Sequence, residues 1–340
     1  MDASTAICTW FVADDAGSAT HFPQVSAMSD APKTQAVYWR CVVGFFASSL
    51  AVNPNARHLL FTNVPVPEID GLDIARWLSR NGIETVVRPI TYRLPPGSVK
   101  NWGNQFYVFD ILDHLSEHRE IHRAVVLDCD CVWLRPADGM VSQIDQHGAL
   151  TYTMHEEDYA RDEVINGLTR GQMARFLEQN GGPSLDAIPY FGGEIYAARS
   201  DVTRRIAQRA RALWPAVRSQ GEDAPREEAH LLSVLYAFEG IAPDTAAPFI
   251  RRMWTTFKFN DLASADADLT IWHLPAEKKT GFADLFARIA AAAELTPSTS
   301  PVQLGLTLEN YARDMGWPQR RPAKLIRDLT LKIAEKFPGR

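Results

Sequence analysis

The stretch AVVLDCDCVWL, residues 124–134, places two aspartates at the end of an apolar segment. Residues 124–127 are apolar and predict a buried strand, which Asp128 and Asp130 follow directly. An ionised carboxylate that is buried without a partner destabilises a fold by several kcal/mol. The pair therefore needs a compensating group, which can be a metal ion, a phosphoryl group or buried cations.

Cysteines alternate with these aspartates. Side chains two residues apart on a strand point to the same face, so we expect Asp128 and Asp130 to share one side and Cys129 and Cys131 the other. A single Cys-x-Cys without a second cysteine pair is no zinc pattern, and the cysteines are expected to be core residues. Two carboxylates at this spacing suit Mg²⁺ or Mn²⁺.

Strands and helices alternate before this stretch. Two of the predicted strands end in acidic residues. Asp14 and Asp15 end the first strand, and Asp128 and Asp130 end the strand at 124–127. Ligands of doubly wound sheets bind at such ends. We therefore expect an α/β fold with a Rossmann-like, mostly parallel sheet flanked by helices. The segments are strands at 6–15, 57–63, 83–90 and 124–127, and helices at 36–51, 69–82 and 101–118.

The second half is less regular. Its patterns predict strands at 149–154, 188–200 and 269–275, and helices at 201–217 and 226–240. The segment TPSTSPVQ, residues 296–303, is the one convincing loop-rich break. We accordingly expect a domain at 1–290 and a helical basic segment at 291–340.

Composition narrows the class of protein. A net charge of −6 gives no support for a nucleic-acid partner. The four cysteines lie in apolar segments and form no Cys-x-x-Cys, and neither a secretion signal nor an 18-residue apolar run is present. These features predict a cytoplasmic protein with free thiols.

The C-terminal end is locally basic. Residues 313–340 hold eight basic and three acidic residues, and apolar residues recur there at helical spacing. Two interpretations remain open. The helix either packs on its own domain or docks on an anionic membrane surface, which would place the protein at the inner face of the membrane. The apolar residues are Leu325, Ile326, Leu329, Ile333 and Phe337.

Two metal-dependent chemistries use Asp-x-Asp after an apolar strand. In glycosyl transfer the pair holds a cation that bridges the diphosphate of a nucleotide-sugar. In haloacid dehalogenase-type phosphatases, Asp128 would be the nucleophile and Asp130 the acid/base. The phosphatase motif normally opens the first strand, whereas 127 residues precede it here, and the expected late acidic metal site is absent.

Residues 104–138 resemble the core of GT-A fold glycosyltransferases, with the closest similarity to glycosyltransferase family 8 and its bacterial relatives. The shared pattern is an aromatic-rich helix, an apolar strand ending in Leu-Asp-x-Asp, and a turn with proline at Pro136. The resemblance implies a GT-A fold, a UDP-linked sugar donor, Mn²⁺ or Mg²⁺ as cofactor, and retention of the anomeric configuration. It also implies a glycan or lipid-linked acceptor.

A second block of this family is His-x-x-Gly-x-x-Lys after a strand. IWHLPAEKKTG, residues 271–281, matches it with Ala276 in place of the glycine. The resemblance implies that His273 is the third metal ligand and that Lys279 contacts the diphosphate. Lys278 lies one residue out of register and could substitute.

Two further blocks match less well. YFGGEIYAAR, residues 190–199, resembles a strand beside the sugar, with Glu194 where the family has asparagine. REEAHLLSVLYAF, residues 226–238, resembles an acidic helix start, with Glu228 and His230 at the acidic positions. Retention needs no dedicated base, whereas inversion would require Glu194 or Glu228. These departures keep open a non-catalytic protein that binds a nucleotide-sugar.

The nucleotide end is predicted by position. In GT-A enzymes the end of the first strand contacts the base and ribose, which makes Asp14 the candidate for that contact. Lys100, Asn101 and Asn104 lie at the start of a predicted helix and are candidates for the ribose or the sugar.

Overall fold

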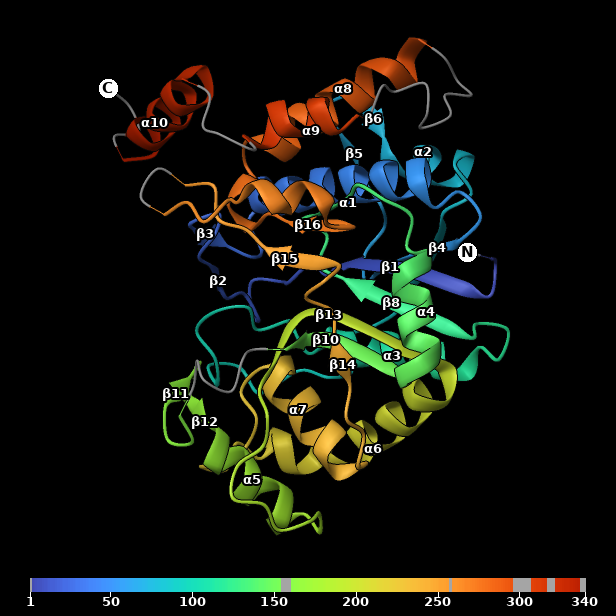
Figure 1. Ribbon diagram of the computed structural model, residues 1–340. Helices are drawn as coiled ribbons and strands as arrows, with labels where there is room; N and C mark the ends of the chain where they lie inside the picture. Colours follow the sequence, from blue (N-terminus) through green and yellow to red (C-terminus); the bar gives the residue numbers. More distant parts are fainter. Residues whose placement is uncertain (1, 154–159, 257–258, 296–306, 317–321, 337–340) are drawn as a thin grey trace.

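The structure is a computed structural model, and it describes residues 2–153, 160–256, 259–295, 307–316 and 322–336. A seven-stranded sheet crosses the centre of the molecule, with helices on both faces (Figure 1). The strand order is β14-β10-β13-β8-β1-β4-β7. The strands are β1 (Thr5–Phe11), β4 (Arg57–Thr62), β7 (Glu84–Val87), β8 (Arg123–Leu127), β10 (Ala149–Thr153), β13 (Phe191–Arg199) and β14 (Asp244–Thr245).

The sheet is mostly parallel. Strands β8, β1, β4 and β7 pair in parallel, whereas β13 runs antiparallel to both of its neighbours, β8 and β10. This mixed α/β architecture confirms the fold class expected from the sequence.

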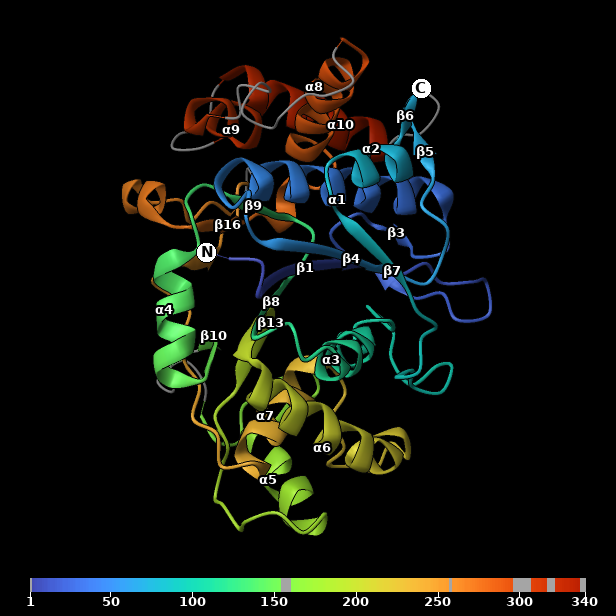
Figure 2. The same ribbon diagram turned by 90° about the vertical axis from the view of Figure 1, so that its right-hand side faces the viewer.

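Helices cover the two faces as separate layers (Figures 1 and 2). One layer contains α1 (Pro32–Val52), α2 (Ile74–Arg80), α8 (Gly281–Leu295) and α9 (Leu308–Met315). The opposite layer contains α3 (Tyr107–Glu117), α5 (Arg170–Gln179), α6 (Ser200–Arg218) and α7 (Glu228–Phe238). Helix α4 (Asp138–His147) buries Met140 and Ile144 in the same core as α1.

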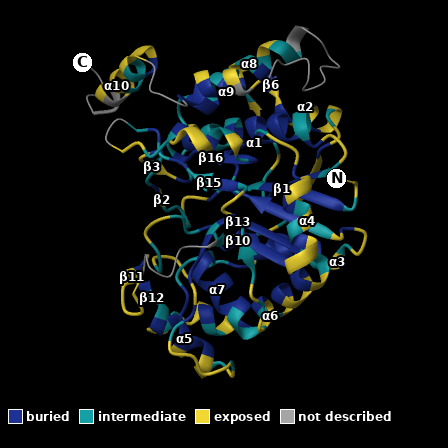
Figure 3. Ribbon diagram, viewed as in Figure 1, coloured by how far each residue is buried: buried dark blue, intermediate teal, exposed yellow. Residues whose placement is uncertain are grey.

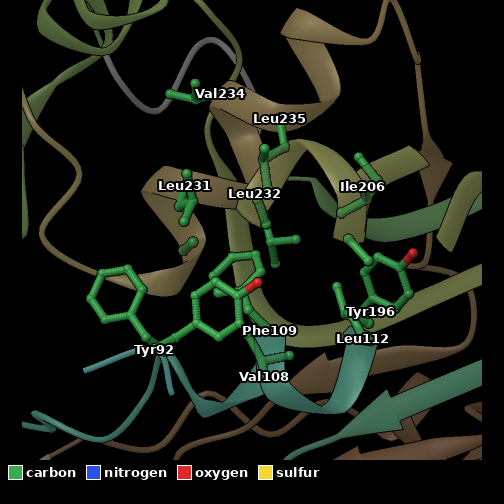
Figure 4. Close-up of a cluster of buried hydrophobic side chains, with 14 of the residues drawn as sticks. Tyr92, Val108, Phe109, Leu112, Tyr196, Ile206, Leu231, Leu232, Val234 and Leu235 are labelled. Carbon is green, nitrogen blue, oxygen red and sulfur yellow. The ribbon is translucent and has the colours of Figure 1, made fainter. Parts of the chain in front are cut away.

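Strand residues alternate between the two cores, as the period of two requires. On β8, Ala124 and Val126 join the core that contains α3, whereas Val125 and Leu127 join the core that contains α1. Buried residues form the interior on both sides of the sheet (Figure 3). The core on the α3 side contains aromatic rings such as Tyr92 and Phe109 together with leucines of α7 (Figure 4).

A second, three-stranded sheet adjoins the carboxyl end of β8. Its order is β15-β16-β9, from β15 (Ile250–Arg252), β16 (Ile271–His273) and β9 (Cys131–Trp133). Strand β8 ends at Leu127, so the aspartate pair lies on the turn that links the two sheets, and not on a strand as the sequence suggested. The cause is the change of sheet, which ends the ladder of β8. Cys129 and Cys131 are buried free thiols, as predicted.

Short elements complete the chain. Three hairpins are β2 (His21–Phe22) with β3 (Ala27–Met28), β5 (Glu68–Ile69) with β6 (Leu72–Asp73), and β11 (Val164–Ile165) with β12 (Leu168–Thr169). Among the described residues, the 3₁₀ helices are η2 (Ser264–Asp268) and η3 (Pro275–Glu277).

The C-terminal part is helical. Helix α8 runs through residue 290, and α9 buries Tyr311 and Met315 in the core that contains α1. The domain boundary at 290 therefore stays a prediction, and the loop-rich segment 296–303 lies outside the described residues. Helix α1 is long and apolar enough to cross a membrane. However, 61% of its most apolar 18-residue stretch is buried inside the protein, as in the core helix of a folded domain.

Helix α10 (Pro322–Lys336) packs through charges. Lys324 is buried with its ammonium 2.9 Å from Glu277 Oε1, and Arg327 pairs with Asp284 of α8. Three residues of the predicted apolar stripe are exposed, Ile326 at 66%, Leu329 at 39% and Ile333 at 61%, whereas Leu325 is half-buried and Phe337 lies outside the described residues. Figure 3 shows this helix as mainly exposed. The packing that the sequence left open therefore leaves most of the described stripe uncovered.

Candidate functional site: an acidic cavity with a three-ligand cluster

A cavity of about 450 Å³ opens where the two sheets meet. This volume is in the range of small-molecule sites. The carboxyl ends of β1 and β8 border it, as expected for ligand sites in such folds. Aromatic and acidic side chains dominate its lining: Trp10, Phe11, Phe22, Tyr38, Trp102, Tyr190 and Trp254, together with Asp128, Asp130, Glu194, Glu227 and Glu228.

Asp128, Asp130 and His273 form a cluster in this cavity. One donor atom of each lies within 4.8 Å of the others. His273 Nε2 lies 3.3 Å from Asp130 Oδ2 and 3.6 Å from Asp128 Oδ2. Antiparallel pairing of β16 with β9 sets His273 opposite Cys131 and so brings the imidazole to the acid turn. The sequence-predicted ligands therefore come together.

The two aspartates differ in environment. The side chain of Asp130 is 2% exposed and that of Asp128 is 38% exposed towards the cavity. Burial opposes ionisation of Asp130, but Lys278 and His273 outweigh it and hold the pKa of this carboxyl below its ordinary value. Desolvation within the cavity and the neighbouring Asp130 raise the pKa of Asp128 to about 7.

The cluster fits a divalent cation. Two carboxylates and one imidazole are a donor set that Mn²⁺ and Mg²⁺ sites use, with further positions left for ligand oxygens or water. His273 Nδ1 is buried and has no hydrogen-bond partner among the described residues. No such hydrogen bond therefore turns the ring away from the orientation in which Nε2 faces the aspartates.

Lys278 enters the cavity and Lys279 does not line it. The ammonium group of Lys278 contacts Asp130 Oδ2 and lies 5.5 Å from the ring centroid of Tyr38. The 3₁₀ turn η3 between His273 and this lysine decides which of the two lysines faces inward. The structure thus brings Lys278 to the site instead of the lysine that the family pattern has in register.

Glu194 lies in the cavity wall on β13. Its Oε1 is 3.0 Å from Nε of Arg252, and its Oε2 is buried without a hydrogen-bond partner among the described residues. Two glycines of β13 lie directly against these carboxylates. A Cβ atom at Gly192 would overlap the carboxylate of Glu194, and a Cβ atom at Gly193 would overlap the carboxylate of Glu228. The Gly-Gly pair therefore makes room for two carboxyl groups.

Glu228 begins α7 and points into the same cavity. Its Oε2 is buried and has no hydrogen-bond partner in the part of the chain that the structure describes. Burial and the nearby charges of Glu227 and Asp128 raise the pKa of Glu228 well above its ordinary value. A neutral carboxylic acid in this position can donate a hydrogen bond to a ligand oxygen.

His230 and Ser233, which follow on α7, have structural contacts. His230 Nε2 lies 2.9 Å from the carbonyl oxygen of Ile165, and Ser233 Oγ accepts a hydrogen bond from the backbone of Phe191 at 3.0 Å. Neither residue lines the cavity. Glu227 does, and it accepts a hydrogen bond from Tyr190 at 2.7 Å.

Of the residues predicted to contact the nucleotide, only some lie at the cavity. Asp14 is buried beside Arg93 at 2.9 Å and does not line the cavity. Asn104 does line it, but its amide donates to the carbonyl oxygen of Val12 at 3.1 Å. Lys100 is exposed, and the Lys100–Asn101 backbone pairs with His21.

Sequence reasoning missed several residues that the structure brings to the site. Arg252 reaches it because β15 pairs with β16, in register with His273. Trp254 follows on the same segment. Trp102 also lines the cavity, and its positive φ of 47° is a strained conformation for a bulky residue. The arginines and tryptophan of RRMW, residues 251–254, were the only signal.

The fold and site thus define a mixed α/β protein with an acidic cavity and a cluster suited to a divalent cation. No family model matches the chain. No curated protein matches it either. Among solved structures, an active-site mutant of LgtC is similar over 79% of this chain and 86% of its own, at 12% identity and a TM-score of 0.46.

Proposed function

We propose that this protein transfers a sugar from a nucleoside-diphosphate sugar to an acceptor hydroxyl group, with Mn²⁺ or Mg²⁺ as cofactor. One observation carries the proposal. Asp128, Asp130 and His273, from a turn and a distant strand, converge within 4.8 Å at the edge of a ligand-sized cavity. The phosphatase interpretation calls for a later acidic site, and a histidine in the cluster gives it no support.

The cluster would hold the cation, which would supply charge neutralisation for the departing diphosphate. Lys278 and Arg252 are the cationic side chains of the same cavity wall, on the two sides of His273. Their charges favour a dianionic group in a cavity that otherwise carries five acids. These residues bind and orient the leaving group in our proposal.

The aromatic wall supports a nucleobase site. Trp10, Phe11 and Tyr38 lie on the cavity side that leads to the acid turn, and a base stacks favourably on such rings. UDP is the nucleotide that we propose first, because the sequence resemblance implies it. Asp14 and Lys100 do not border the cavity, so we assign the nucleotide contact to the aromatic wall.

We propose that the acceptor binds near Glu194 and Glu228. Each presents a carboxyl oxygen that has no hydrogen-bond partner among the described residues, and Tyr190 and Trp254 line the same cavity. Acid and hydroxyl side chains with aromatic rings bind sugar hydroxyl groups well. Retention, which the resemblance implies, needs no ionised base, and this agrees with the raised pKa of Glu228.

Helix α10 supports a second interaction. We propose that its exposed stripe, Ile326, Leu329 and Ile333, inserts into an anionic lipid surface. The stripe lies at helical spacing on a locally basic segment, so apolar burial and charge attraction act together. The protein would then act at the inner face of the membrane on a glycan or lipid-linked acceptor.

A thermal-shift panel tests the transferase proposal. Nucleoside diphosphates and their sugars are added to the protein with and without Mn²⁺. Ligand at a hundredfold excess over its dissociation constant stabilises the fold by about 2.7 kcal/mol, so the right nucleotide raises the melting temperature only when Mn²⁺ is present. The absence of any shift across the panel would contradict the proposal, and hydrolysis of an aryl phosphate would favour the phosphatase.

A further inference from the structure

The side chains of Lys278 and His273 converge on one oxygen of the site. The ammonium group of Lys278 contacts Asp130 Oδ2, and His273 Nε2 lies 3.3 Å from the same atom. Lys278 is only 5% exposed, and Asp130 is 1% exposed. The oxygen that a divalent cation would share with Asp128 and His273 is therefore already neutralised by a lysine from this chain.

A cation in the cluster and the Lys278 ammonium cannot both keep this position. Both are positive, and like charges a few ångströms apart in a buried site repel strongly. When His273 Nε2 binds the cation instead of Asp130, this oxygen is left between the cation and the ammonium group. Their repulsion favours withdrawal of the ammonium group from Asp130 when the cation binds.

The surrounding structure allows the side chain to move while the backbone stays fixed. Glu277, 1% exposed, anchors the turn before Lys278 by accepting hydrogen bonds from Thr280 Oγ1 at 2.7 Å and Gly281 N at 3.2 Å. Lys324 of α10 neutralises Glu277 at 2.9 Å. The flexible four-carbon stem of Lys278 is then the moving part, and it faces the cavity.

We propose that Lys278 is a built-in counter-cation that neutralises Asp130 while the site is empty and transfers to the diphosphate when cation and donor bind. This proposal rests on the proposed function, because it needs both a cation and a diphosphate. Its consequence is a coupling between the two ligands. Each makes the other bind more tightly, since the cation releases the lysine and the diphosphate gives it a new partner.

The prediction concerns binding and needs no turnover. Mn²⁺ affinity is measured by the electron paramagnetic resonance signal of free Mn²⁺, without and with UDP. In the unaltered protein we expect UDP to tighten Mn²⁺ binding by about 10-fold or more. In Lys278→Met, Mn²⁺ alone should bind about 10-fold more tightly than in the unaltered protein, and the enhancement by UDP should shrink to a few-fold.

Lys279→Met is the matched control, because it removes the neighbouring lysine, which does not line the cavity. We expect it to keep the affinity and the coupling of the unaltered protein. Lys278→Gln, which keeps a polar end without the charge, serves as the second variant if the methionine variant does not fold.

The outcomes separate the two proposals. Wild-type Mn²⁺ affinity in the Lys278 variants, with full enhancement by UDP, would overturn the counter-cation proposal and leave the proposed function intact. Mn²⁺ binding by none of the proteins, with or without UDP, would overturn both. Weaker binding of Mn²⁺ by Lys278→Met would also overturn the counter-cation proposal. If the lysine competes with Mn²⁺ for Asp130, its removal cannot weaken Mn²⁺ binding.

Discussion

The imidazole Nε2 of His273 lies 3.3 Å from Asp130 Oδ2, across the pairing of β16 with β9. The pairing sets His273 opposite Cys131, and Leu274 N donates to the Asp130 carbonyl oxygen at 2.9 Å. A slip of one residue in this register would turn the imidazole to the other face. The second sheet therefore assembles the candidate metal site.

Removal of the imidazole should weaken metal binding. For His273→Ala we expect an affinity for Mn²⁺ at least about 10-fold lower, since changes even to the outer-shell partners of metal ligands cost 10–100-fold. Isothermal titration calorimetry measures it. His147→Ala, on α4 and away from the cavity, is the control. An unchanged affinity in His273→Ala would remove this residue from the site.

Glu228 should act as a neutral acid. Because its pKa is raised well above its ordinary value, we expect Glu228→Gln to retain turnover within about 10-fold, since an amide can also donate a hydrogen bond. Glu228→Ala, which leaves the position without a donor, should lose more of it. Steady-state kinetics of both variants give the answer. If Glu228→Gln were as inactive as Glu228→Ala, an ionised base would be required.

Loss of the apolar stripe should release the protein from anionic vesicles. The double variant Ile326→Ser with Ile333→Ser should bind phosphatidylglycerol-containing vesicles about 10-fold or more weakly, because two exposed side chains no longer insert. Co-sedimentation measures it. Val87→Ser, which removes an apolar residue 62% exposed on β7, is the matched control.

Point variants are sharper here than a truncation. Deleting residues 313–340 would also remove Lys324 and leave the buried Glu277 carboxylate without its ammonium partner. Breaking a buried pair in this way costs about 3–5 kcal/mol. Equal vesicle binding by the double serine variant and the unaltered protein would count against the membrane proposal.

His58 should make the fold sensitive to acid. This histidine is 2% exposed beside Ser49 at 2.9 Å, and burial lowers its pKa to about 4 from 6.5. The unfolded chain takes up a proton near pH 6.5, whereas the folded one resists it down to about 4. Stability is therefore fully present above pH 6.5 and is lost as the pH falls through this window, by on the order of 2 kcal/mol between pH 7 and 5.

Urea unfolding at pH 7 and pH 5 measures the contribution of His58. In His58→Gln the loss between the two pH values should be smaller by about this amount, because glutamine does not titrate there. His114, whose pKa burial also lowers to about 4, stays in both proteins and cancels from the difference. An identical pH dependence in the variant would show that His58 is not the source.

Much of the fold followed from local pattern. The strand at Arg123–Leu127 and the carboxyl-edge position of the acid pair were predictable because apolar runs and polar ends are local signals. The reversed direction of β13 was not, because its pairing between β8 and β10 depends on long-range contacts. The same holds for the turn that carries Asp128 and Asp130, which exists because the chain changes sheets there.

The site was predictable only in part. His273 came from a family-like block, whereas Arg252 reaches the cavity through strand pairing that the sequence does not reveal. The choice of Lys278 over Lys279 depends on the 3₁₀ turn η3, whose geometry no spacing rule specifies. His273 was found only because a family-like block marked it, since its place in the site also depends on sheet pairing, whereas Arg252 carried no such mark and was missed.

The most direct test of the central claim is release of nucleoside diphosphate from a panel of nucleotide-sugars by the unaltered protein and by Asp130→Asn. We predict that the unaltered protein turns over one donor when Mn²⁺ or Mg²⁺ is present, and that Asp130→Asn lowers this rate at least about 100-fold without a change in circular dichroism. Equal turnover by the variant, or turnover that is unaffected by a chelator, would contradict the account.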